Sequence, residues 1–257
     1  MRLDKYLAEY RFSSRTKAAR AIAEGRVFVN GRQGKASEDV SDKDTIDIRE
    51  NPLSFVSEGG YKLQKAFDDF GGSVRGLVCV DLGASTGGFT DCLLQAGAAE
   101  VYAVDVGKDQ LDEALRADTR VHVLDEMNVR YLQRADIPAG RIEAIAADLS
   151  FISLKLILPV IGRLLDAGGV AYILVKPQFE CGGIGLNKHG ILKDEKKRRE
   201  IVFEIADSAA RLGLQPIDIT EAPIREGKNV EYVLQVRKTG FPAELEERFI
   251  NKVTELK

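Results

Sequence analysis

A glycine-rich segment near residue 85 carries the residue types that hold a nucleoside-containing cofactor. Residues 80–91 read VDLGASTGGFTD, an apolar strand that ends in an aspartate and runs into a glycine-rich loop. Glycine lets a backbone approach a ligand closely and adopt conformations that side chains disfavour. The loop is GASTGG rather than the GxGxxG of dinucleotide-binding folds, because Ser85 and Thr86 stand at its centre. A nucleoside cofactor and a simple tight turn both fit the glycine spacing alone.

Acidic and amide side chains after the next two predicted strands extend this candidate cofactor site. Asp105 ends such a strand, where a carboxylate can hold both hydroxyls of a ribose. Asp125 and Asn128 follow the third strand and could flank an adenine. The alternatives are a helix cap for Asp105 and a capping or turn role for the other two. The candidate cofactor-binding residues are Asp81, Gly83, Ala84, Ser85, Thr86, Gly87, Gly88, Phe89, Asp105, Asp125 and Asn128.

Alternating strands and helices are needed to position these residues. The predicted strands are 77–82, 100–106, 120–124, 141–151, 170–177, 214–220 and 230–236. The predicted helices are 61–70, 88–96, one that starts at Asp109, 153–165 and 193–212. Such alternation indicates βαβ units on a parallel sheet, with an antiparallel pair possible at the end. The expected fold class is α/β, a Rossmann-like domain with a mostly parallel seven-stranded sheet.

Positive charge is concentrated at the start of the chain, although the net charge of the protein is -3. Residues 2–35 contain nine Lys and Arg against three Asp and Glu. A basic segment on an acidic protein favours a domain that binds a polyanion, and a solvated helix face is the alternative.

Residues 1–50 predict a small α+β domain of two helices and an antiparallel sheet. The second helix is expected to begin after a Ser14 cap and to end at Gly25. Asn30-Gly31 is the preferred two-residue hairpin turn, because both of its positions must accept positive φ. The residues of the second helix expected to face inward are Ala18, Ala19, Ile22 and Ala23.

The motifs of this segment, RLDKYL followed by SSRTKAARAIAEGRVFVNG, resemble the RNA-binding domain of ribosomal protein S four over nearly its whole length. In that family the second helix and the following turn lie along RNA phosphates. Lys and Arg side chains contact such a backbone without reading its sequence. The resemblance implies RNA contacts by Arg2, Arg11, Arg15, Lys17, Arg20, Arg26 and Arg32.

The rest of the chain resembles the FtsJ-like methyltransferases, and more closely the TlyA family. GASTGGFTD, DLSFISL, VKPQFE and NVEY occur here in the order of that family, behind the basic N-terminal domain that TlyA proteins carry. The resemblance implies S-adenosyl-L-methionine as cofactor, ribosomal RNA or ribosomal subunits as partner, and methyl transfer to a ribose 2'-hydroxyl. No particular oligomeric state is predicted. The expected domains are an RNA-binding domain at 1–50, a linker at 51–59, a methyltransferase domain at 60–240 and a C-terminal helix at 241–257.

The catalytic set of the family carries over to four dispersed residues. They are Lys62 in EGGYKL, Asp148 in ADLSF, Lys176 in LVKPQFE and Glu231 in NVEYV. Lys176 is expected to act as general base or oxyanion stabiliser, while the other three position it and the ribose. Singly, each residue also fits a structural role, such as a helix cap or a solvated charge. Lys65, three residues after Lys62, is a possible substitute.

Two further features flank these positions. Phe151 and Phe179 could stack a base that is flipped out of structured RNA, and core packing is the alternative. After VKPQFE the chain continues as CGGIGLNKHGILKDEKKRRE, a glycine-rich loop and a basic run. That run fits a solvated helix start or an extension of a phosphate-binding surface.

Other functions fit parts of the sequence. A base methyltransferase would place an Asn/Asp-Pro-Pro-aromatic turn at DLSF, and those prolines are missing. An RNA-binding, ribosome-associated protein without catalysis is the second alternative. A membrane-active haemolysin is the third, since similar proteins carry that label, and the longest apolar stretches are broken before about 18 residues.

Composition excludes several other classes. The start of the chain carries charge throughout and predicts no signal peptide, so the expected location is cytoplasmic with no membrane partner. The cysteines (Cys79, Cys92 and Cys181) lack CxxC spacing and are expected to be reduced. His122 and His189 lack metal-ligand spacing, so no metal is expected.

Overall fold

The computed structural model describes the chain apart from residues 13–14, 24, 42, 49–54, 224–226 and 257, and apart from the side chains of 16, 17, 20 and 23. Contacts divide the chain into two units, Met1–Ser54 and Phe55–Lys257. The expected linker at 51–59 is divided between them, because Phe55 is only 1% exposed and packs in the core of the second unit. Each unit is described by itself below.

The first unit packs two helices on a three-stranded antiparallel sheet of order β2-β1-β3. The β1–β2 turn is Asn30-Gly31, with φ of 52° and 82°, as the Asn-Gly pair predicts. Ala19 is exposed, contrary to expectation, and Ala21 is buried in its place, so the inward stripe of the second helix is shifted. The Ser14 cap and the Ala23 side chain lie outside the described residues. The elements are α1 (Leu3–Tyr10), α2 (Arg15–Ala23), β1 (Val27–Val29), β2 (Arg32–Gln33) and β3 (Ile46–Ile48).

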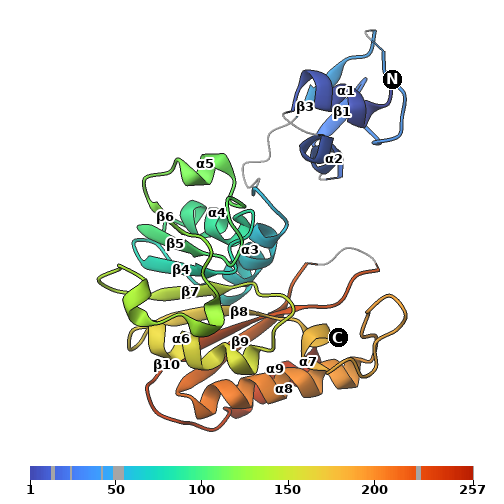
Figure 1. Cartoon of the computed structure of the whole chain (residues 1–257). Coiled ribbons are helices and arrows are strands. Elements are labelled where there is room, and N and C mark those ends of the chain that lie inside the picture. The colour runs from blue at the N-terminus through green and yellow to red at the C-terminus, as the bar shows by residue number, and fades with distance from the viewer. Residues whose placement is uncertain (13–14, 24, 42, 49–54, 224–226, 257) are drawn as a thin grey trace. The chain divides into compact units, whose positions relative to one another are not determined.

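The second unit is built on a seven-stranded sheet of order β6-β5-β4-β7-β8-β10-β9 (Figure 1). Strands β4 to β8 are parallel, and β10 is antiparallel to both β8 and β9. This arrangement confirms the predicted α/β class with an antiparallel pair at the end. Its strands are β4 (Val78–Leu82), β5 (Glu100–Val104), β6 (Val121–Leu124), β7 (Ala144–Ala147), β8 (Val170–Val175), β9 (Leu214–Glu221) and β10 (Tyr232–Lys238).

Helices cover both faces of this sheet (Figure 1). Side chains of α3 and α4 pack on one face with Cys79 of β4, whereas α6, α8 and α9 pack on the other face with Val80 and Leu82. Alternate residues of a strand point to opposite faces, so β4 contributes to both cores. The helices are α3 (Gly59–Phe70), α4 (Gly88–Gln95), α5 (Glu113–Arg116), α6 (Leu158–Leu164), α7 (Pro177–Glu180), α8 (Glu195–Arg211) and α9 (Glu247–Glu255). Short 3₁₀ turns are η1 (Val129–Tyr131), η2 (Arg134–Asp136) and η3 (Leu154–Leu156).

Three predicted elements are shorter or divided in the structure. The helix predicted from Asp109 is only α5, since Asp109 has a φ of 54° and Asp112 caps the turn that follows. The helix predicted at 153–165 is η3 followed by α6, which begins with Pro159 in its first turn. The strand predicted at 141–151 is β7 alone, and the chain leaves the sheet before Phe151, whose φ is 62°.

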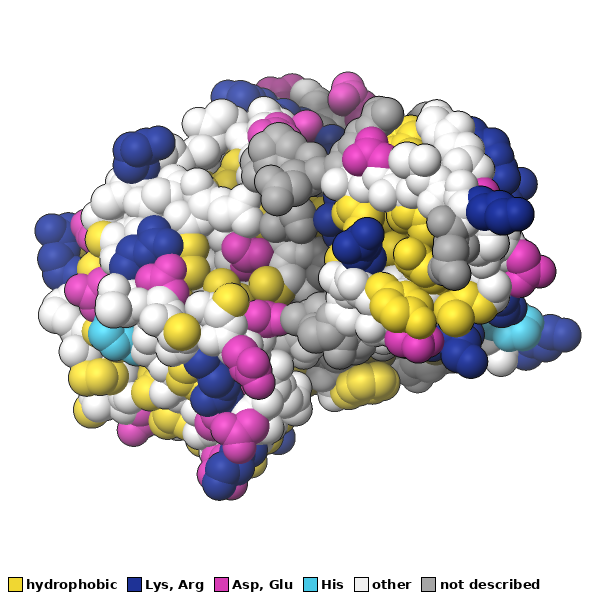
Figure 2. Space-filling view, turned by 90° about the horizontal axis from the view of Figure 1, so that it is seen from above, with side chains coloured by type: hydrophobic (Ala, Val, Ile, Leu, Met, Phe, Trp, Pro, Cys, Tyr) yellow, Lys and Arg dark blue, Asp and Glu magenta, His cyan; other side chains and the backbone are white. Residues whose placement is uncertain are grey.

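One face of the molecule is mixed in charge, in keeping with the small net charge of the protein. Lys and Arg side chains are interspersed with Asp and Glu on the face that Figure 2 shows, and hydrophobic side chains lie between them. Within the described part of the chain, no helix is long and apolar enough to cross a membrane.

Gly83, at the end of β4, allows the chain to pass close to β7. Its φ is +87°, and a Cβ there would lie 2.6 Å from the backbone oxygen of Asp148. Gly76 also has a positive φ, +75°, but a Cβ there would meet nothing within 4 Å. A side chain at Gly76 would therefore cause backbone strain alone, whereas one at Gly83 would cause both strain and a steric clash.

We expect Gly83→Ala to destabilise the protein by about 3 kcal/mol, because it adds a clash to the strain, and Gly76→Ala by about 1 kcal/mol from strain alone. Urea unfolding of both variants measures the two costs. Equal losses at the two positions would show that Asp148 does not constrain the loop.

Candidate active site

The loop between β4 and α4 is held by the neighbouring strand. The backbone N–H groups of Gly83 and Ala84 donate to the Val104 carbonyl at 2.9 and 3.1 Å. Asp105, just after β5, accepts the Ser85 N–H at 2.8 Å and the Gly107 N–H at 2.7 Å. The glycine loop and the acidic residue predicted to act with it are therefore directly bonded to each other.

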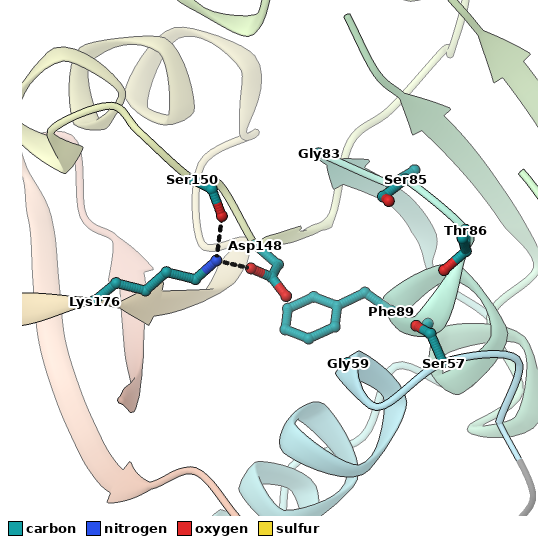
Figure 3. A pocket seen from close by; sticks show the side chains of 11 residues that line it. Ser57, Gly59, Gly83, Ser85, Thr86, Phe89, Asp148, Ser150 and Lys176 are labelled. Carbon is teal, nitrogen blue, oxygen red and sulfur yellow. Dashed lines mark hydrogen bonds and ion pairs between the residues drawn. The ribbon is translucent and has the colours of Figure 1, made fainter. Parts of the chain in front are cut away.

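A pocket of about 210 Å³ opens beside this loop (Figure 3). The start of α3 forms its opposite wall, and the Val56 N–H donates to Asp91 of α4 at 2.8 Å, which ties the two helices together. Asp148 and Lys176 enter the pocket from the ends of β7 and β8. The lining residues are Ser57, Gly59, Gly83, Ala84, Ser85, Thr86, Gly88, Phe89, Asp148, Ser150 and Lys176.

Asp81 lies beneath the loop and does not line the pocket. It is fully buried, and its Oδ2 accepts a hydrogen bond from the Thr90 hydroxyl at 2.7 Å, whereas its Oδ1 has no partner. Burial, with a contribution from the charge of Asp148, raises the pKa of Asp81 to about 7. An unpartnered carboxylate oxygen in this position suits a nearby positive charge.

Lys176 and Asp148 form a partly buried ion pair in the pocket. The Lys176 Nζ lies 2.5 Å from Asp148 Oδ1 and donates to the Ser150 hydroxyl at 2.8 Å (Figure 3). Lys176 is only 8% exposed. Two of the three N–H bonds of a protonated ammonium are therefore engaged, and one is left for a substrate.

A second pair lies at the same edge of the sheet. The Lys62 Nζ on α3 is 2.6 Å from Glu231 Oε2, and Gln178 donates to Glu231 Oε1 at 2.9 Å. Glu231 directly precedes β10, and Tyr232 pairs in register with Val175, the last residue of the antiparallel strand β8, so Glu231 and Lys176 lie at the same edge of the sheet. The structure thus groups the predicted catalytic residues into two ion pairs.

Other predicted positions lie away from the pocket. Asp125 pairs with Arg116 at 2.7 Å, which lowers the pKa of Asp125, and Asn128 caps η1 by accepting the Arg130 N–H. Neither of the two lines the pocket. Lys65 pairs with Asp69 at 2.7 Å and does not line it either.

The aromatic residues beside the pocket are Phe151 and Phe179, with ring centroids 4.9 Å apart. Phe151 is 90% exposed, which excludes a core-packing role for this side chain. Glu180 of α7 accepts the Ser153 hydroxyl and the Leu154 N–H, each at 2.7 Å. The segment that carries Phe151 is therefore fixed to α7.

In the first unit, several of the predicted RNA-contacting arginines are oriented by carboxylates. Arg2 and Arg15 both donate to Asp4, and these hydrogen bonds lower the pKa of Asp4 to about 2. Arg32 donates to Glu38 at 3.2 Å. Arg11 is exposed and Arg26 half-buried, whereas the side chains of Lys17 and Arg20 lie outside the described residues.

Comparison with known proteins identifies the family. Residues 55–238 match the model of the FtsJ-like methyltransferases, and residues 1–46 match that of the S4 domain. The chain belongs to the FtsJ-like methyltransferase family. The resemblance inferred from the sequence motifs is thereby confirmed.

Relatives of this FtsJ-like methyltransferase are similar over most of their length. YqxC of Bacillus subtilis, a candidate rRNA methyltransferase, is 42% identical over 93% of this chain and 86% of its own. The 16S/23S rRNA (cytidine-2'-O)-methyltransferase TlyA of Mycobacterium tuberculosis is 39% identical over 87% of this chain and 84% of its own. A solved structure of a candidate hemolysin from Streptococcus thermophilus has 35% identity and a TM-score of 0.76, covering 99% of this chain and 94% of that one.

Three polar residues of the FtsJ-like domain were not anticipated from the sequence. Ser150 and Gln178 lie inside the DLSF and VKPQFE motifs. Their place in these motifs could have identified them, although their side chains alone do not indicate catalysis. Ser57 lines the pocket from the segment before α3, in what was expected to be a linker. In the part of the chain that the structure describes, no cluster of three or more His, Cys, Asp or Glu could hold a metal ion.

The raised pKa of Asp81 predicts a pH-dependent stability. Because its pKa is 3.8 when unfolded and about 7 when folded, the folded state binds the proton more tightly in this interval. The stabilisation is complete below the unfolded pKa and is lost as the pH rises through the folded pKa. Asp81→Asn removes this loss, so its unfolding free energy relative to wild type should rise by up to about 4 kcal/mol between about pH 4 and pH 8.

Urea unfolding of wild type and Asp81→Asn across this pH range measures the difference. Asp68→Asn, at an exposed position of α3, is the matched control and should show no comparable trend. A pH-independent difference between Asp81→Asn and wild type would refute the assignment.

Proposed function

We propose that this protein transfers a methyl group from S-adenosyl-L-methionine to a ribose 2'-hydroxyl of ribosomal RNA. The observation that carries the proposal is the partly buried Asp148–Lys176 pair, 2.5 Å between Oδ1 and Nζ, inside the pocket formed by the glycine loop. A lysine beside a candidate cofactor site supports chemistry that removes the proton of a hydroxyl group or stabilises the resulting oxyanion.

The pocket fits the methionine end of this cofactor in charge and hydrogen bonding. Ser85 and Thr86 line the cavity with hydroxyl groups, and Asp148 lines it with a carboxylate. The fully buried Asp81, two residues before Gly83 of the cofactor loop, has one carboxylate oxygen without a hydrogen-bond partner. Asp105 after β5 is the residue to hold the ribose, as acidic residues do at this position in nucleotide folds. When bound, the cofactor supplies an electrophilic methyl group on a positively charged sulfur.

The residues of this chain act on the acceptor. A ribose hydroxyl is a weak acid, so it needs a group that removes its proton or stabilises the developing oxyanion. We assign that role to the Lys176 Nζ, held in place by Asp148 and Ser150. Lys62 and Glu231 position the ribose from the neighbouring strand and helix, so the two pairs together define the acceptor site.

RNA as the acceptor is supported by both units. The S4-type unit presents arginines held by Asp4, and such residues contact phosphates. The exposed Phe151 ring contacts Phe179, whose ring centroid lies 5.9 Å from the Lys176 Nζ, and it suits stacking on an unpaired base. A relative similar over most of the chain is named as an rRNA cytidine-2'-O-methyltransferase. Action on ribosomal RNA implies a cytoplasmic site of action.

The alternatives predict different products. A base methyltransferase would leave the label on a nucleobase, and a purely RNA-binding protein would transfer none. A haemolysin would release the contents of liposomes without a methyl donor. Nuclease digestion of the labelled product and a liposome leakage assay distinguish these outcomes.

We expect Lys176→Ala to lower kcat for transfer of labelled methyl groups to ribosomal RNA by about 100-fold or more, because the acceptor oxygen loses its base or stabilising cation. Lys252→Ala is the matched control, since it removes another partly buried Lys–Asp pair, with Asp218, outside the pocket. Assays use full-length protein with naked transcripts and with ribosomal subunits. Undiminished transfer by Lys176→Ala would exclude this lysine as the reacting group.

Gln178 is expected to act through Glu231. Gln178→Ala removes the hydrogen bond to Glu231 Oε1 and should lower kcat about tenfold, since a bond to a charged group contributes about 1.5–3 kcal/mol. Gln64→Ala, which removes a bond to Asp68 on the same helix as Lys62, is the control. Measurement of kcat and KM separates the effects, and a change in KM alone would contradict a positioning role.

A further inference from the structure

A second and larger pocket lies at the same edge of the sheet as the catalytic residues. It has a volume of about 570 Å³ and lies between the segment that follows α7 and the end of the β9–β10 connection. The polar residues that line it are Asn187, His189, Lys193, Lys228 and Asn229. None of these lines the cofactor pocket, so the two sites are distinct.

The first wall of this pocket is a closed turn. The Asn187 N–H donates to the Ile191 carbonyl at 3.0 Å, and the Gly190 N–H donates to the Asn187 carbonyl at 2.9 Å. The Asn187 side-chain oxygen also accepts the N–H groups of His189 and Ile191, at 2.8 and 3.1 Å. The turn is therefore ordered by its own hydrogen bonds.

Residues 227–229 form the second wall of the pocket, and Asn229 binds this wall to the first. Its side-chain oxygen accepts the Leu192 N–H at 2.9 Å, and its side-chain amide donates to the Gly190 carbonyl at 2.9 Å. Asn229 is two residues before Glu231 of the proposed catalytic set. The pocket and the catalytic edge are thus connected through a short, bonded segment.

A buried arginine holds the backbone of the pocket by hydrogen bonds. Arg198 is 5% exposed and donates to the carbonyls of Leu192 and Lys193 at 3.2 and 2.8 Å, and to the Tyr232 hydroxyl at 3.1 Å. Tyr232 begins β10, next to Glu231. This support fixes the backbone that carries Lys193 relative to the sheet.

Four lysines on or next to this pocket are exposed. Lys188, Lys193, Lys196 and Lys228 make no ion pair or side-chain hydrogen bond with other residues that the structure describes. The acidic residues nearby are already engaged: Asp194 caps α8, Glu195 pairs with Arg199, and Glu200 pairs with Lys197. The pocket therefore presents ammonium groups that no described carboxylate pairs with.

We propose that this pocket binds the phosphate backbone of the substrate RNA beside the target nucleotide. The inference rests on the proposed function, because the adjoining catalytic edge makes RNA the polyanion that reaches it. Ammonium groups on a fixed frame neutralise phosphates and release counterions, whatever the base sequence. The volume suits one or two nucleotides rather than a helix. The second unit would then hold RNA by itself, in addition to the S4-type unit.

The test compares two double variants of the full-length protein, each of which lacks two positive charges. Lys193→Ala/Lys228→Ala removes two lysines of the pocket, and Arg75→Ala/Arg248→Ala removes two exposed arginines, one before β4 and one on α9, outside both pockets. KM and kcat for methyl transfer to a ribosomal RNA transcript are measured over a range of salt concentrations. Fluorescence anisotropy gives the Kd for the same transcript.

The pocket variant should raise KM and Kd about tenfold, leave kcat within about twofold, and reduce the slope of log Kd on log salt by about 1.5. The control pair should change none of these values by more than about twofold. The Lys193→Arg/Lys228→Arg variant keeps both charges and should bind the transcript with the Kd of the wild type. Equal effects of the two alanine pairs, or a loss of kcat at unchanged Kd, would overturn the proposal. Absence of methyl transfer by the wild type would instead refute the proposed function, while the anisotropy measurement still decides whether the pocket holds RNA.

Discussion

The second unit is arranged around the buried ammonium of Lys176. An unpaired cation in this position would cost several kcal/mol, so the fold must bring a carboxylate to it. Asp148 does so at 2.5 Å, and Ser150 adds a hydroxyl. Both partners follow β7, and Lys176 follows the parallel neighbour β8, so the pair exists only because these two strands are adjacent. The glycine at the end of β4 completes the arrangement, since it lets the cofactor loop pass over the backbone of Asp148.

The alternation of side chains along strands explains why the candidate residues meet. Continuing each strand by one residue places Asp105, Asp148, Lys176 and Glu231 on the face covered by α3 and α4, the same face as Asp81. Helix α3 covers that face and carries the lysine that pairs with Glu231. Residues separated by more than a hundred positions therefore meet at one edge of the sheet. The order of the strands and the alternation of side chains along each strand bring them there.

Much of this was predictable from the sequence, and the remainder was not for physical reasons. The strand-loop-helix of the cofactor site, the Asn-Gly hairpin and the α/β alternation depend on local patterns that the residues carry themselves. The inward face of α2 keeps Ala18 and Ile22 but includes Ala21 rather than Ala19, a choice that packing against the rest of the unit makes. The grouping of Lys62 with Glu231 depends on the order of strands, which periodicity does not encode. The bond from Gln178 depends on a four-residue helix too short to be recognised in advance.

That short helix, α7, converts a sequence motif into a site. Pro177 begins it directly after Lys176, where the missing backbone N–H of proline costs no helical hydrogen bond. Gln178 then reaches Glu231, and Glu180 fixes the segment that carries the exposed ring of Phe151. One turn of helix thereby connects three groups. They are Lys176, which we assign to the acceptor hydroxyl, the Glu231 carboxylate of the second pair, and the exposed ring proposed to stack on a nucleobase. The chain then enters the fixed turn of the basic pocket, so a continuous segment links the site of chemistry to the proposed RNA contact. A displacement of α7 would move all of these groups together, which makes the geometry of the site depend on a helix that has little stability of its own.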